Sequence, residues 1–309
     1  MQKTKTNKLI NMISKILYLI FAIVIFSSCG SGGGNNTLEV PDSVKFAGTP
    51  EVSDETMKGI VENVSSPVEM AALIKSMGVP YSKKYLATTS YLSKYNTSMQ
   101  QALALGIFGA DLGYLNMYGK TGSVVDYLST IKTLADNLNI GQFFDFTTLK
   151  RLASNNTNMD SMMYISVHSF NQMDNYLREN KRGSLSALII AGVWLEGMYL
   201  ATQVAKEKSN AKLDERIGGQ KEILSYLMII LDNYSRDADF KKYRDEFKII
   251  SDKFSGIKIT YEVGEPESVI ENGVLTVKQM DKSIVSSTPE QLQQIRTTIE
   301  EVRTRLINI

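Results

Sequence analysis

The chain has 309 residues, of which 43% are hydrophobic, and its 34 basic residues nearly balance 33 acidic ones. This length and composition suffice for a large core in one or two domains, so stability does not require a metal or a disulfide. The single cysteine, Cys29, and the single histidine, His168, exclude an internal disulfide and a zinc or di-iron site built on several such ligands. We therefore predict no metal and no cofactor.

The first 28 residues have the pattern of an export signal. Four lysines and no acid precede an apolar run over residues 16–26, which is shorter than the about 20 residues that a membrane-spanning helix needs. The small residues Ser27, Ser28, Cys29 and Gly30 follow this run. They resemble the lipobox of bacterial lipoproteins, in the looser Bacteroidota-type form, because Phe26 occupies the position where leucine is usual.

This resemblance implies that the signal is removed before Cys29 and that Cys29 receives the lipid. The membrane then becomes a partner through the lipid, and residues 29–52 hold the lipidated cysteine and a flexible, glycine-rich tether. We expect the outer membrane, because neither Gly30 nor Ser31 is the aspartate that resembles an inner-membrane retention signal. Loss of four lysines with the signal changes the formal net charge from +1 to −3, which does not support nucleic-acid binding.

Residues 53–255 are predicted to form a helical domain, because apolar residues recur there at helical spacing. Glycine or proline interrupts the pattern at residues 78–80, 119–122 and 181–183, as is typical of helix ends. The clearest predicted helices cover residues 67–77, 82–94, 97–118, 123–138, 158–179, 184–207, 220–234 and 239–253. We interpret the polar stretch 206–219 as a surface insertion.

Two parts of the helical region resemble each other. Residues 104–109 match residues 187–192 at four of six positions, which aligns Gly109 with Gly192, and shorter matches follow in the same order. We predict a mainly α fold that is a duplicated array of antiparallel helix pairs, solenoid-like or a bundle, with related halves at about 82–155 and 156–254. The alternative is that helical proteins share such fragments through composition alone.

Residues 256–309 are predicted to form a small β-hairpin and a terminal helix that packs on the helical domain. Apolar and polar residues alternate over 257–263, and Asn272-Gly273 between two apolar runs is a strong hairpin signal. Thr288 and Pro289 are typical of a helix start. The apolar residues of this helix recur in steps of three and four, so its stripe packs on the domain or, alternatively, on a partner.

Glycines inside two apolar helices call for an explanation, because each costs about 1 kcal/mol relative to alanine in a helix interior. They are Gly106, Gly109 and Gly113 in the segment 97–118, and Gly192 in the segment 184–207. We interpret them as sites where neighbouring helices approach closely, with a ligand slot as the alternative.

The same two helices contain Asp111 and Glu196, which would be costly if they were buried without partners. Glu196 follows the only tryptophan, Trp194, by two residues, so these three residues are the candidates for ligand binding. The alternative for Glu196 is a structural hydrogen bond to a neighbouring helix. No nucleophile elbow accompanies His168, and we assign no catalytic residue.

The leading functional hypothesis is a lipid-anchored helical module that binds or organises a protein partner in the cell envelope. A second hypothesis is a small-molecule binding protein with a pocket near Trp194 and Glu196. A third is a hydrolase that uses the paired carboxyls of Asp111 and Glu196.

Overall fold

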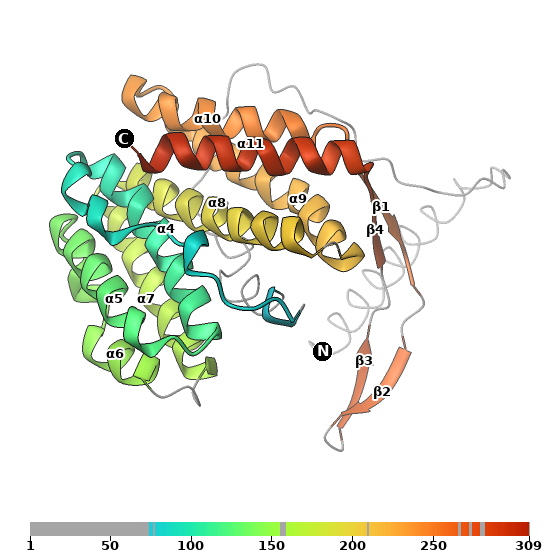
Figure 1. Cartoon of the computed structure of the whole chain (residues 1–309), viewed down its shortest axis with the longest axis horizontal. Coiled ribbons are helices and arrows are strands. Elements are labelled where there is room, and N and C mark those ends of the chain that lie inside the picture. The colour runs from blue at the N-terminus through green and yellow to red at the C-terminus, as the bar shows by residue number, and fades with distance from the viewer. Residues whose placement is uncertain are drawn as a thin grey trace, which may run out of the picture. The chain divides into compact units, whose positions relative to one another are not determined.

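The computed structural model describes residues 74–76, 78–154, 159–208, 210–264, 267–271, 274–278 and 282–308. The signal peptide, Cys29 and the tether lie outside these residues, as does most of the predicted helix 67–77. The described chain is mainly helical, with short antiparallel strands and a terminal helix, which confirms the predicted fold class (Figure 1).

The first group of helices comprises α4 (Ser98–Met117), α5 (Thr121–Asn137), α6 (Phe146–Ser154) and α7 (Met159–Glu179), and each packs on the next. A short 3-10 turn, η3 (Gly141–Phe143), connects α5 to α6. Thr97 begins α4 with a capping box, because its side chain accepts the Gln100 N–H and the Gln100 side chain accepts the Thr97 N–H. Helix α6 was not among the clearest predicted helices.

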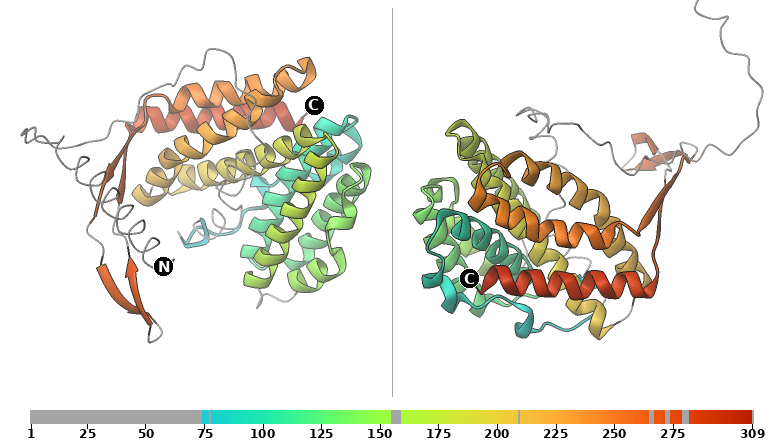
Figure 2. Two further views of the ribbon diagram at one scale, coloured as in Figure 1. Left: turned by 180° about the vertical axis from the view of Figure 1, so that it is seen from behind. Right: turned by 90° about the horizontal axis from the view of Figure 1, so that it is seen from above.

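The second group comprises α8 (Gly183–Glu207), α9 (Ala211–Tyr234), α10 (Ala238–Phe254) and α11 (Pro289–Ile307). Each packs on the next, and α11 returns to contact α8, so that α10 and α11 lie side by side (Figure 2). Thr288 caps α11 as Thr97 caps α4, with Pro289 in the first turn. The predicted stripe of α11 is buried in this group: Leu292, Ile295, Ile299, Val302 and Leu306.

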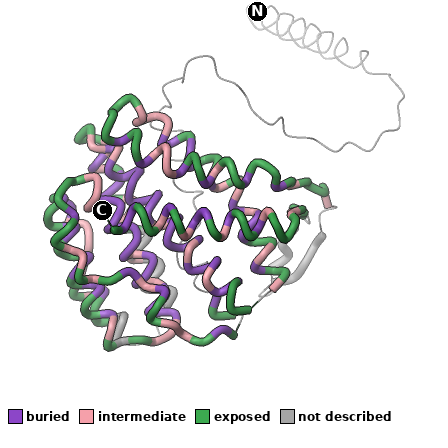
Figure 3. The backbone as a smooth tube through the Cα atoms, turned by 45° about the horizontal axis from the view of Figure 1, so that its top comes forward, coloured by how far each residue is buried: buried purple, intermediate pink, exposed green. Residues whose placement is uncertain are grey.

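Helices α4 and α8 form the most extensive helix contact in the described chain and join the two groups. Most of their residues are buried, whereas outer helices alternate buried and exposed residues (Figure 3). Helix α8 is also the one described helix that is long and apolar enough to cross a membrane, yet 89% of its most apolar window is buried within the protein. Its apolar character is therefore explained by its central position.

The strands form an arm, which we define as residues 258–286. Strand β1 (Lys258–Glu262) pairs antiparallel with β4 (Lys282–Ser286), and β2 (Glu267–Glu271) pairs antiparallel with β3 (Val274–Lys278). The predicted hairpin is therefore present as β2 and β3, and its Asn272-Gly273 turn lies outside the described residues. Strand β4 was not predicted. Its Val285 packs on α9, where a Cβ atom added to Gly218 would come within 2.7 Å of the Val285 side chain.

The predicted helix over residues 82–94 is wrong. This segment forms two 3-10 turns, η1 (Lys83–Tyr85) and η2 (Thr89–Lys94), with Leu86 in an extended conformation between them. The Ala87 N–H donates to the Asp111 carboxyl group, and the Ala87 carbonyl accepts the Tyr127 hydroxyl. Because tertiary partners take both of these backbone groups, the segment does not continue as an α-helix.

The predicted surface insertion over residues 206–219 is also wrong, because α9 begins within it at Ala211. The Asn210 side chain caps this helix by accepting the Leu213 N–H. Leu213 and Ile217 are fully buried, four residues apart, and extend the stripe that continues to Leu224. Burial of these side chains makes the polar segment the first turns of a core helix.

Candidate functional site

The contact between α4 and α8 depends on two glycines. A Cβ atom added to Gly106 would lie 2.1 Å from the carbonyl oxygen of Ile189, and one added to Gly192 would lie 2.2 Å from the carbonyl oxygen of Leu103. These are backbone atoms that cannot rotate away, so only glycine permits this approach. Each carbonyl belongs to the residue three positions before the opposite glycine, which makes the contact reciprocal. The expected helix contact is confirmed for Gly106 and Gly192.

Gly109 does not take part in this contact, because a Cβ atom added there would meet nothing within 4 Å. The predicted equivalence of Gly109 and Gly192 is therefore wrong, and the contacts relate Gly192 to Gly106. Gly109 lies three residues beyond Gly106 in α4, outside this contact. Gly113 is half-buried further along α4. The internal duplication itself stays a prediction.

The close approach of the two helices brings Asp111 of α4 together with Glu196 of α8. Both residues have no exposed surface. The charge of Glu196 lies close enough to raise the pKa of Asp111. The two acids that stood out in the sequence thus form one buried pair.

Arg303 of α11 completes this group. Its Nε donates to Oε2 of Glu196 at 2.9 Å and its Nη2 to Oε1 at 2.7 Å, so the ion pair is bidentate. The guanidinium carbon lies 4.2 Å from the centre of the Tyr199 ring, and Nη2 is 3.5 Å from the Tyr85 carbonyl oxygen. We call Asp111, Glu196 and Arg303 the buried triad.

The surroundings of Asp111 favour the protonated form of its carboxyl group. Its Oδ2 accepts the Ala87 N–H at 2.9 Å, and no donor in the described part of the chain reaches Oδ1. Burial, followed by the nearby charge of Glu196, raises the pKa of Asp111 well above its ordinary value of 3.8, although Arg303 acts in the opposite direction. When Asp111 carries a proton, the charges of the triad balance, because Glu196 and Arg303 form an ion pair.

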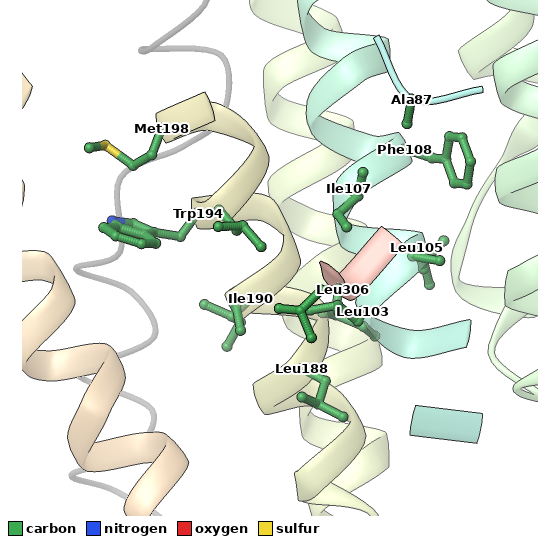
Figure 4. Packing of buried hydrophobic residues seen from close by; sticks show 14 of the residues in the cluster. Ala87, Leu103, Leu105, Ile107, Phe108, Leu188, Ile190, Trp194, Met198 and Leu306 are labelled. Carbon is green, nitrogen blue, oxygen red and sulfur yellow. The ribbon is translucent and has the colours of Figure 1, made fainter. Parts of the chain in front are cut away.

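Trp194 does not share a pocket with Glu196. Its indole N–H donates to Oε1 of Gln220 at 3.1 Å, and its ring contacts Phe247 and Phe254 of α10. Figure 4 shows the ring pointing away from the labelled residues of α4. The predicted combination of Trp194 and Glu196 is therefore divided between two faces of α8, and each side chain has partners within the protein.

A second buried polar cluster connects α7 and α8, and sequence reasoning missed it. Ser186 donates to Asp174 at 2.5 Å, and Arg178 forms an ion pair with the other oxygen of Asp174. These residues and Tyr234 line a cavity of about 10 Å³, which has room for roughly one water molecule. The cluster therefore connects helices and does not offer space for an organic ligand.

Within the described ranges, no three His, Cys, Asp or Glu side chains come together as a set of metal ligands. His168 is exposed on α7. Arg303 is the residue of the triad that sequence reasoning missed, although a signal existed: it follows Ile299 by four residues and precedes Leu306 by three, which places it beside the buried stripe of α11.

Comparison of the chain with protein-family models, with curated proteins and with solved structures found no match.

Proposed function

We propose that the chain is a lipid-anchored module of the cell envelope that binds or organises a protein partner, and that it is not an enzyme. The proposal combines the export signal and lipobox-like sequence around Cys29 with a helical body whose charged interior residues are paired with one another. The anchor would hold the module at the outer membrane, and the tether would let it reach a partner.

The observation that carries the proposal is that the buried triad is closed to solvent and has its partners within the protein. Both carboxyl groups have no exposed surface, and their hydrogen bonds come from Arg303 and from the Ala87 N–H. A substrate therefore has no route to Asp111 or Glu196 in this conformation. Removal of one member of such a group would leave a buried charge or an unsatisfied donor, which favours a structural role for the triad over catalysis.

Crosslinking in living cells tests this function. The tagged full-length protein is crosslinked in the intact envelope, and the captured proteins are identified beside those captured by a Cys29→Ser control. A defined envelope protein that is captured by the wild type and lost from the control supports an anchored binding module. Capture of no protein above the control would contradict it.

A further inference from the structure

The outer edge of strand β1 has no partner strand in the described part of the chain. Among the described strands, β1 pairs only with β4, so its other edge presents unpaired N–H and C=O groups. Strand β4 is the one that packs on α9, through Val285, and β1 lies on the side away from the helices (Figure 1). As far as the described residues show, the free edge of β1 is therefore open to another strand.

Most side chains of β1 are also exposed. Tyr261 is 44% exposed, and Val263, just beyond the strand, is 83% exposed. A two-stranded ribbon needs support, which α9 provides to β4, and a third or fourth strand adds to its stability. The arm thus has both the backbone edge and the apolar side chains that a further strand would cover.

The charges of β1 specify which strand fits. Its sequence is Lys-Ile-Thr-Tyr-Glu, with exposed Lys258 at one end and exposed Glu262, opposite Lys282 of β4, at the other. Neither Lys258 nor Glu262 forms an ion pair within the described part of the chain. Antiparallel pairing of two copies centred on Thr260 places Lys258 of each opposite Glu262 of the other. The apolar residues between these ends then face each other, with Cβ atoms about 4.5–5.5 Å apart.

This charge pattern makes a second copy of β1 a complementary partner. A lysine at a sheet edge ordinarily discourages pairing with a foreign strand, and here only a strand with an acid at the matching position compensates it. Strand β4, with the sequence Lys-Ser-Ile-Val-Ser, contains no acid, so its free edge lacks this complementarity. A two-fold axis at Thr260 satisfies both ends at once, as an interface between identical subunits requires.

We propose that two copies of the chain associate through the free edges of β1, antiparallel and centred on Thr260, into a four-stranded sheet in the order β4-β1-β1-β4. The association does not depend on the lipid anchor or on the identity of any envelope partner.

The test uses full-length chains in the intact envelope. Thr260→Cys places two thiols opposite each other at the two-fold axis, and mild oxidation should yield a disulfide-linked dimer at least about tenfold above that of Ser283→Cys, an exposed position on β4 of the same ribbon. The unsubstituted chain controls for Cys29, and fatty-acid labelling of Cys29 in the same cells reports on the anchor separately.

Charge reversal provides the second measurement. In the Thr260→Cys background, Lys258→Glu or Glu262→Lys alone should lower the dimer yield about tenfold, because like charges then meet at both ends. Coexpression of the two reversed chains with different tags should restore a mixed dimer, which also shows that each variant folds. Equal yields for Thr260→Cys and Ser283→Cys, or yields that neither reversal changes, would overturn the proposal.

Discussion

Replacement of Gly106 by alanine should separate the two central helices. The new Cβ atom would lie 2.1 Å from the carbonyl oxygen of Ile189 and 2.8 Å from the amide nitrogen of Val193, whereas ordinary contacts begin at about 3.4 Å. Both obstacles are backbone atoms in a continuous helix. Relief therefore requires that α4 and α8 move apart along their most extensive contact.

The expected cost follows from two opposing effects. Excess volume in a well-packed core costs about 1–3 kcal/mol and occasionally more, and we expect the upper end because backbone must move. Alanine recovers about 1 kcal/mol of helix propensity relative to glycine. The free energy of unfolding should thus fall by about 2 kcal/mol or more. Gly192→Ala should behave in the same way, because its added Cβ would lie 2.2 Å from the Leu103 carbonyl oxygen.

Gly109→Ala is the matched control, since it makes the same change in the same helix where an added Cβ meets nothing within 4 Å. It should leave stability unchanged or raise it by up to about 1 kcal/mol. Denaturant unfolding monitored by circular dichroism measures all three variants. Equal stabilities of Gly106→Ala and Gly109→Ala would refute the reasoning, because helix propensity and unfolded-state effects cancel between them.

Three further predictions concern the triad and the anchor. Glu196→Ala should lower the free energy of unfolding by about 3–5 kcal/mol, because it leaves Arg303 buried without its partner, and a second change of Arg303 to Met should recover part of this loss in the same unfolding assay. Wild-type stability should fall as pH rises from 3.8 through the raised pKa of Asp111, because the folded state holds that proton more tightly than the unfolded chain. A pH series of unfolding curves should show this decrease for the wild type but not for Asp111→Asn. The same dependence of stability on pH in both proteins would contradict the prediction. Cys29→Ser should abolish incorporation of labelled fatty acid and leave uncut precursor or soluble protein, whereas unchanged labelling would show that Cys29 is not the lipidated residue.

Local patterns predicted most of the helical elements correctly. The apolar stripe of α11 and the capping residues Thr97 and Thr288 mark features that neighbouring residues along the chain decide. The Asn272-Gly273 pair likewise predicted a hairpin that is present as β2 and β3. Strand β4 was not predicted, because its pairing with β1 joins residues 20 to 28 positions apart.

The candidate site was predictable only in part. Asp111 and Glu196 stood out because a charged residue in an apolar helix carries a high cost of burial, whatever the fold. Arg303 did not stand out, because it lies in a helix with several other exposed charges and 107 residues from Glu196. Trp194 was assigned to the same site through its position in the sequence, yet it faces a different side of α8 from Glu196.

The sequence by itself determined where helices form and which groups would be costly to bury, because hydrophobic periodicity, capping and desolvation act on each segment locally. Only the tertiary structure decided which polar and charged groups pair with one another. The meeting of Gly106 with the backbone of α8 sets the register of the two central helices, and this register brings Asp111 to Glu196. The same packing explains why Ala87 is not in the predicted helix: its N–H donates to Asp111. A buried carboxyl group needs a donor, and the donor can come from any part of the chain.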